Sequence, residues 1–228
     1  TLMVPECISN ILAIKSDFYM LLQCSDRNGT FSSKAIEVLK QNMNNYSILS
    51  IGNGMQKNNV TISLVEQVLK SDKKVVLDAD ALWAAQKNMD LLKRNETTIL
   101  TPHIKEMSDL TGINITTILS NPFEIARDFS KEYKNCVLIL KSSQTYIAHQ
   151  GNVYVLDAQN AGLAKGGSGD ILCGIVVAML GQCKDPMQAA LCATYLHSQS
   201  AKLDIDLASF MPEDIINNIP NTLKRLRS

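Results

Sequence analysis

The sequence has no excess of charge of either sign. Its 22 lysine and arginine residues balance 22 aspartate and glutamate residues, so the formal net charge at pH 7 is zero. A basic patch is the usual requirement for binding nucleic acid or an anionic membrane surface, and we therefore expect neither as a partner. The chain also has no long apolar run, since the longest candidate span, Ile171 to Leu180, is too short to cross a bilayer.

Cysteine and histidine lack the spacing of a metal site. The six cysteines contain no C-x-x-C pair, and the three histidines lie far apart in the sequence. Neither a zinc site nor a disulfide framework is indicated. The cysteines mostly lie in apolar runs, which is typical of buried free thiols, so we expect a cytoplasmic protein. The segment Thr1 to Pro5 lacks the basic start and apolar stretch of a signal peptide.

Short β-rich runs alternate with helical patterns along the chain. This alternation predicts an α/β fold with a parallel sheet, and the last two strands are expected to form a hairpin around Gln150-Gly151-Asn152. The predicted strands are Phe18–Leu22, Ser47–Ile51, Lys74–Leu77, Thr97–Leu100, Val137–Lys141, Tyr146–His149 and Val153–Leu156. The predicted helices are Ser32–Met43, Thr61–Ser71, Ala81–Asn88, Ile104–Thr111, Pro122–Tyr133, Asp170–Gly181, Pro186–Leu203 and Pro212–Leu226.

One segment combines a glycine-rich loop, an aspartate and an apolar helix. Four of the eight residues from Gly162 to Gly169 are glycine, and Asp170 follows them. Glycines let backbone N–H groups converge on an anion, and the helix adds its positive dipole end. A carboxylate there repels phosphate but can accept a proton from a hydroxyl that faces it, so Asp170 is predicted to be a general base. The predicted anion hole consists of Gly166, Gly167, Ser168 and Gly169.

Two common nucleotide-binding motifs are not matched. Ser168 stands where the P-loop pattern G-x-x-x-x-G-K-[ST] requires lysine. Lys57 stands where the third glycine of the dinucleotide pattern should follow Gly52 and Gly54. For these two glycines, a plain strand-to-helix turn and a close approach of backbone to ligand both stay open.

Polar residues follow the ends of four predicted strands. Ligands of open α/β sheets bind at this edge, so we expect the residues to converge there. Asp78 is the candidate to reach a polar ligand or, indirectly, a hydrated Mg²⁺, and no direct metal ligand is predicted. Asp80 is well explained as a helix N-cap. The full set is Gly52, Gly54, Asp78, Asp80, Thr101, His103, Glu106, Lys141 and Thr145.

His103 could cap the helix that follows it, but its place among the other clusters favours substrate contact. Lys141 could extend along the strand end, although the hydroxyl side chains after it favour contact with a nucleotide phosphate or ribose. His149 and His197 are expected to be surface or core-edge residues.

Three motifs in this order resemble a known family. They are Thr-Pro-His with Glu106, Lys-x-x-x-Thr, and Asn-x-Gly-x-Ala-x-Gly-Gly-Ser-Gly-Asp. Together with Leu-Asp-Ala-Asp-Ala-Leu they resemble the ADP/ATP-dependent NAD(P)H-hydrate dehydratases of the ribokinase-like superfamily. The resemblance implies a three-layer sandwich, with a mostly parallel sheet between helices. It also implies repair of hydrated NADH or NADPH, whose ring hydroxyl is phosphorylated by ADP or ATP with Mg²⁺ before phosphate is eliminated.

The resemblance assigns the binding residues. Asp170 would be the base for the ring hydroxyl, and the hydrate would contact Gly52, Gly54, His103, Asn160 and Asp170. The adenine nucleotide would contact Lys141, Ser142, Ser143, Gln144, Thr145 and Gly169. The sequence departs from the family in two places: Gly52-Asn53-Gly54-Met55-Gln56 replaces Gly-Pro-Gly-Leu-Gly, and Lys141-Ser142-Ser143-Gln144-Thr145 replaces Lys-Gly-Ala-x-Thr.

The family also begins with a strand and helix that this sequence lacks. Residues 1–228 are therefore expected to form one ribokinase-like domain without its first strand–helix unit, which would supply part of the hydrate pocket. That unit would be absent, separate, or replaced by the join to a fused epimerase domain. A homo-oligomer is also expected. Two alternative functions stay open: a ribokinase-like hydroxyl kinase for a vitamin precursor, and an inert nucleotide-binding module.

Overall fold

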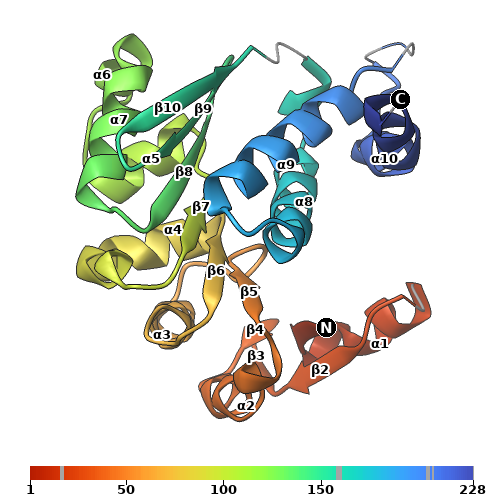
Figure 1. Cartoon of the computed structure of the whole chain (residues 1–228). Coiled ribbons are helices and arrows are strands. Elements are labelled where there is room, and N and C mark those ends of the chain that lie inside the picture. The colour runs from red at the N-terminus through yellow and green to blue at the C-terminus, as the bar shows by residue number, and fades with distance from the viewer. Residues whose placement is uncertain (16–17, 158–160, 204–205, 207, 228) are drawn as a thin grey trace.

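The computed structural model describes residues 1–15, 18–157, 161–203, 206 and 208–227. Its centre is a six-stranded sheet in the order β10-β9-β8-β7-β6-β5 (Figure 1). The four strands β5 to β8 are parallel, and β9 and β10 are antiparallel. The strands are β5 (Ile48–Ile51), β6 (Lys74–Leu77), β7 (Thr98–Leu100), β8 (Cys136–Lys141), β9 (Thr145–His149) and β10 (Asn152–Leu156). The predicted mostly parallel sheet is confirmed.

The predicted hairpin joins β9 to β10 through a two-residue turn. Gln150 and Gly151 have φ of 49° and 82°, and His149 pairs with Asn152 across the turn. Positive φ at both central residues is typical of a type I′ turn, whose twist matches the strands it joins.

Helices cover both faces of the sheet (Figure 1). One face carries α2 (Ala35–Asn42), α3 (Asn59–Leu69), α4 (Asp80–Ala85), η2 (Gln86–Lys93), α5 (Ile104–Thr111), α6 (Ile115–Ser120) and α7 (Pro122–Glu132). The other face carries α8 (Ser168–Gln182) and α9 (Pro186–Ser200), with α10 (Pro212–Arg227) against α9. The short helices η1 (Met43–Asn45) and η3 (Ala161–Ala164) complete the list. The expected three layers are confirmed.

Alternation along the strands builds two hydrophobic cores. In β6, Val75 and Leu77 pack beneath α3 and α4, whereas Val76 packs beneath α8. The same alternation separates Leu100 from Ile99 in β7. Successive side chains of a strand point to opposite faces, so these continuous apolar runs supply both cores.

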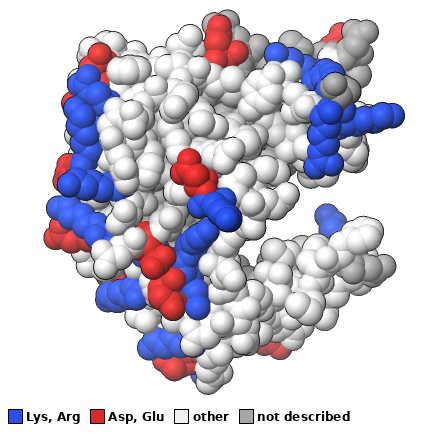
Figure 2. Space-filling view, viewed as in Figure 1, with Lys and Arg blue, Asp and Glu red and all other residues white. Residues whose placement is uncertain are grey.

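The N-terminal part forms small sheets of its own. Strands β1 (Leu2–Pro5) and β2 (Leu21–Cys24) pair in parallel, with α1 (Glu6–Lys15) between them in the chain, and β3 (Asp26–Arg27) pairs with β4 (Thr30–Phe31). Among the described residues β5 pairs only with β6. Figure 2 shows a deep hollow between the lobe that carries α1 and the body of the molecule. Ile11, Ile14 and Phe18 are 57 %, 87 % and 98 % exposed on this lobe.

Several sequence predictions were wrong in detail. Helices α1 and α6 were not predicted, and the predicted strand Phe18–Leu22 is displaced, because β2 runs from Leu21 to Cys24. All six cysteines are free, but Cys7 and Cys192 are exposed rather than buried. No helix within the described part of the chain has the length and apolarity to span a membrane.

Candidate active site

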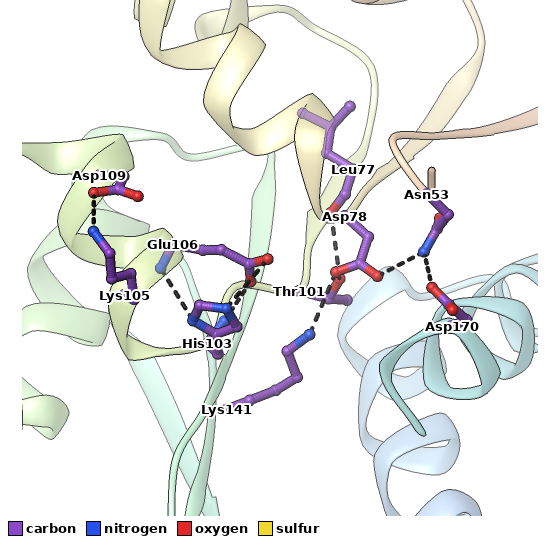
Figure 3. Close-up of polar contacts among 10 residues, drawn as sticks. All are labelled: Asn53, Leu77, Asp78, Thr101, His103, Lys105, Glu106, Asp109, Lys141 and Asp170. Carbon is purple, nitrogen blue, oxygen red and sulfur yellow. Dashed lines mark hydrogen bonds and ion pairs between the residues drawn. The ribbon is translucent and has the colours of Figure 1, made fainter. Parts of the chain in front are cut away.

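The carboxyl ends of β5, β6, β7 and β8 bring together a hydrogen-bonded network centred on Asp78 (Figure 3). The Asp78 side chain is only 4 % exposed, and its Oδ1 accepts hydrogen bonds from Thr101 Oγ1 at 2.7 Å and Lys141 Nζ at 3.3 Å. Its Oδ2 accepts from Asn53 Nδ2 at 3.0 Å. A carboxylate this deeply buried needs such partners, because an unpaired buried charge is costly.

Gly52 is required by the close approach of two loops. A Cβ on Gly52 would lie 1.8 Å from the Asp78 carbonyl oxygen and 2.8 Å from Ala81 Cβ, and the φ of Gly52 is +132°. The next residue of the Asp78 loop, Ala79, also has positive φ (47°) and occupies the N-cap position of α4. Strained backbone of this kind is often found at functional sites.

Asp80 is not the N-cap of α4, contrary to the sequence interpretation. It lies in the first turn of that helix, where its Oδ2 accepts from Gln56 N at 2.8 Å. The carboxylate therefore ties the loop after β5 to the start of α4. Both loops that follow β5 and β6 are thus held together by backbone contact and by this bond.

His103 does cap a helix. Its Nδ1 accepts from Glu106 N at 3.1 Å, and Glu106 Oε2 accepts from His103 N at 2.8 Å, which closes a reciprocal capping box at the start of α5. The His103 side chain is still 53 % exposed, so capping does not remove it from reach of a ligand. Figure 3 places it on the side of Lys141 away from Asp170.

The glycine-rich loop leads into α8 as predicted. Gly167, with φ of 94°, is the N-cap, and Ser168 and Gly169 form the first turn with Asp170. No hydrogen-bond acceptor within the described residues is recorded for the backbone N–H groups of Gly169 and Asp170. Free N–H groups at the N-terminus of a long helix are a ready anion-binding site. Asp170 itself is exposed, and its Oδ1 lies 2.5 Å from Asn53 Nδ2.

His197 is buried, and not the surface residue that one reading of the sequence allowed. Its Nε2 is 3.2 Å from Ser168 Oγ, at the foot of the anion loop. Burial lowers the pKa of His197 to about 4, and Lys141 lowers it further while the bond with Ser168 opposes the shift. The imidazole is therefore neutral at physiological pH.

The Cys173 thiol is not suited to nucleophilic chemistry, although it lies one turn beyond Asp170. Burial raises the pKa of Cys173 to about 11, and its Sγ is paired with Ser50 Oγ at 3.2 Å. Reactive cysteines need the opposite, a lowered pKa and exposure.

A cavity of about 620 Å³ opens beside the anion loop. The predicted nucleotide residues Lys141, Ser142, Ser143, Thr145 and Gly169 line it, as does Ser168 of the predicted anion hole. Gln144 is not among the lining residues, and its Oε1 accepts from Tyr146 Oη at 3.0 Å. Helix α9 contributes a further wall of the cavity, which was not predicted from the sequence. This wall consists of Thr194, His197 and Ser198.

A family model described as NAD(P)H-hydrate dehydratase matches residues 5–221. The chain belongs to this family. Among curated relatives, the bifunctional NAD(P)H-hydrate repair enzyme Nnr of Moorella thermoacetica is 32 % identical over 99 % of this chain and 44 % of its own length. The ADP-dependent (S)-NAD(P)H-hydrate dehydratase of Bacillus subtilis is 34 % identical over 79 % of this chain and 65 % of its own length. The chain thus spans less than two thirds of the length of each of these two relatives.

Solved structures inside and outside the family share the fold of this chain. The ADP/ATP-dependent NAD(P)H-hydrate dehydratase from Bacillus subtilis, co-crystallised with ATP and Mg²⁺, superposes with a TM-score of 0.78 at 26 % identity and covers 99 % of this chain and 79 % of its own. Hydroxyethylthiazole kinase from Pyrococcus horikoshii superposes with a TM-score of 0.61 at 14 % identity, over 98 % of this chain and 87 % of its own. The second likeness shows the fold alone.

The side chains around Asp78 do not fit direct coordination of Mg²⁺ by the protein. Both oxygens of Asp78 already accept hydrogen bonds from Thr101, Lys141 or Asn53, and the side chain is nearly inaccessible. Within the described ranges, no group of three or more His, Cys, Asp or Glu side chains could hold a metal ion. Of the predicted site residues, Asn160 lies outside the described residues. Gly54 lies on the loop after β5, with φ of +69° and open space around it.

Proposed function

We propose that this chain catalyses the nucleotide-dependent dehydration of hydrated NADH or NADPH. The observation that carries the proposal is the exposed carboxylate of Asp170 beside the N–H groups of Gly169 and Asp170, which have no acceptor among the described residues. That pairing suits transfer of a phosphoryl group to a hydroxyl, because the N–H groups bind phosphate and the carboxylate accepts the hydroxyl proton. Membership of the dehydratase family supports the choice of substrate.

The proposed reaction has two steps, phosphorylation of the ring hydroxyl and elimination of phosphate. Asp170 takes the proton from the ring hydroxyl. The hydroxyl oxygen attacks the terminal phosphorus of ADP or ATP, and the bond from that phosphorus to the oxygen of the leaving nucleotide breaks. The C–O bond of the phosphorylated hydrate then breaks. Phosphate leaves with a proton from the neighbouring ring carbon, which restores the double bond of the reduced nicotinamide. Lys141 lies near the helix start, 3.5 Å from the position of a Cβ on Gly169, and places positive charge beside the phosphates.

The cavity beside the loop is proposed to hold the adenine nucleotide. Its walls combine hydroxyl side chains with apolar residues such as Leu156 and Leu172, a mixture suited to a nucleoside. Any Mg²⁺ is proposed to arrive on the nucleotide phosphates. Gly52, Gly54, His103 and Asn160 remain the predicted contacts of the hydrate.

The test is turnover of NADH hydrate with ADP or ATP, followed through the absorbance of the reduced nicotinamide. Recovery of absorbance with release of phosphate is expected. Phosphorylation of an alcohol without elimination would instead support the hydroxyl kinase, and nucleotide binding without turnover would support the inert module. The preferred nucleotide and the preferred hydrate follow from the same assay.

We further propose that a strand and helix outside residues 1–228 complete the sheet beside β5. Among the described residues one edge of β5 has no partner strand, the hollow lies next to it, and apolar residues of the α1 lobe are exposed. Open strand edges and apolar patches are usually covered in native proteins. Residues 1–228 should be compared with the full-length polypeptide in melting temperature and hydrate affinity. Equal values would contradict this proposal.

We also propose the partners and the location of the protein. The added segment would be a strand–helix unit of the same polypeptide, or would join a fused or separate epimerase, as the bifunctional relatives suggest. A homo-oligomer is proposed from the exposed apolar residues. The free state of all six cysteines supports a reducing, cytoplasmic location.

A further inference from the structure

The amide of Asn53 bridges two carboxylates that come from different parts of the chain. Its Nδ2 lies 3.0 Å from Asp78 Oδ2 and 2.5 Å from Asp170 Oδ1 (Figure 3). A carboxamide nitrogen carries two hydrogens, so it can donate one to each carboxylate. Asn53 follows β5, Asp78 follows β6, and Asp170 lies in the first turn of α8.

The two carboxylates that Asn53 bridges differ in how firmly they are held in place. Asp78 is nearly buried and is fixed by Thr101 and Lys141, whereas Asp170 is exposed. The buried end therefore anchors the amide, and the second N–H is held toward Asp170. Hydrogen bonds to an ionised acceptor are shorter and stronger than neutral ones, so the contact is strong enough to orient an exposed side chain.

We propose that Asn53 is a positioning residue for Asp170, an inference that rests on the proposed role of Asp170 as the base. Donation to Oδ1 leaves Oδ2 free to accept the substrate proton. Without the amide, two carboxylates would face each other across the site with no donor between them.

The contact is a feature of this sequence. Asn53 stands where the resembled pattern Gly-Pro-Gly-Leu-Gly has proline, whose side chain has no donor. Neighbouring Gly52 fixes the loop against the Asp78 backbone, so the amide is delivered to the site by a loop that cannot shift freely. Asn53 is exposed, and its replacement therefore removes donors without opening a cavity in either core.

The test compares Asn53→Ala and Asn53→Asp with the wild type, and with Asn114→Ala as a matched control. Asn114 caps α6 through Thr116 N and lies away from the site. Asn53→Ala should lower kcat about tenfold to a hundredfold, the scale expected for a misplaced catalytic group, with the KM for nucleotide unchanged. Asn53→Asp should lose more, since it places a third carboxylate in the network. Asn114→Ala should keep the wild-type kcat.

The split between kcat and KM supplies a readout that a purely structural role would not move. In Asn53→Ala kcat should fall while the KM values for nucleotide and hydrate stay at the wild-type level, and Asn53→Gln, which keeps a donor amide, should recover part of the loss. A crystal structure of the Asn53→Ala protein should show the Asp170 carboxyl displaced from its wild-type position, a result that needs no turnover. That measurement separates the inference from the proposed function, which fails if the folded wild type does not turn over the hydrate.

An unchanged kcat and an unchanged position of the Asp170 carboxyl in a folded Asn53→Ala protein would overturn the inference. A change confined to the KM for the hydrate would also overturn it, because Asn53 would then be a substrate contact. Melting temperatures of all variants, measured beside Asn114→Ala, establish that each protein is folded.

Discussion

At the scale of single residues, Asp170 is the side chain on which the proposed chemistry depends. We expect Asp170→Asn to lower kcat about 10²- to 10⁴-fold, because the amide keeps the shape but cannot accept the hydroxyl proton. Nucleotide affinity should stay close to the wild-type value, since the N–H groups of the anion loop are unaltered. Steady-state kinetics and nucleotide titration measure the two effects. More than half of the wild-type rate in the variant would rule out the assignment.

Gly52 tests the contact between the loops after β5 and β6. Gly52→Ala should lower the free energy of unfolding by more than about 3 kcal/mol, since its Cβ would overlap the Asp78 carbonyl. Gly54→Ala is the control, because Gly54 also has positive φ but has no atom within 4 Å of the added Cβ. It should cost only about 1–2 kcal/mol, the penalty of the left-handed conformation. Denaturant unfolding of both variants gives the comparison, and equal losses would refute the steric explanation.

The sequence could predict the residues whose role depends on local pattern. Asp170, the glycine loop and Lys141 follow from motif and strand-end position, and the structure brings them together. The role of Asn53 could not be predicted, because its partners lie 25 and 117 residues away. His197 could have been suspected, since Thr194, His197 and Ser198 have the spacing of one helical face. Which way that face turns is decided only by packing.

At the scale of elements, the start of α8 is the candidate anion site. Inorganic phosphate should perturb the backbone N–H resonances of Gly169 and Asp170 more than those at any other helix start, because these two groups have no acceptor among the described residues and lie at the positive end of the helix dipole. Amide chemical-shift mapping, with chloride at matched ionic strength as the control, measures this. A nucleotide complex with its phosphates far from this loop would contradict the assignment.

The elements themselves were predicted best where they are buried. Strands β6, β7 and β8 read as continuous apolar runs because helices cover both of their faces. Helix α1 was missed although Ile8, Ile11 and Ile14 recur at helical spacing, and all three are substantially exposed. A stripe that stays largely exposed among the described residues gives little contrast between a core face and a solvent face.

At the scale of the whole molecule, buried His197 links stability to pH. Its pKa is about 4 in the folded protein against 6.5 for the free side chain, so the unfolded chain binds the proton first as pH falls. The contribution to stability is complete above pH 6.5 and is lost on acidification toward pH 4, by about 3 kcal/mol. Denaturant unfolding between pH 4 and 7, with His197→Gln as the comparison, measures it. A variant as pH-sensitive as the wild type would show that other groups are responsible.

The two hydrophobic cores also determine the order in which parts of the molecule open. Strands β6, β7 and β8 each contribute to both hydrophobic cores, so neither core can be lost while their ladder stays intact. In amide hydrogen exchange these strands should therefore exchange only through global unfolding, whereas the two-stranded sheet β1–β2 should exchange through local opening. The carboxyl ends of these slowly exchanging strands carry Asp78, Thr101 and Lys141. The network around the candidate base is thus attached to the part of the chain that opens last.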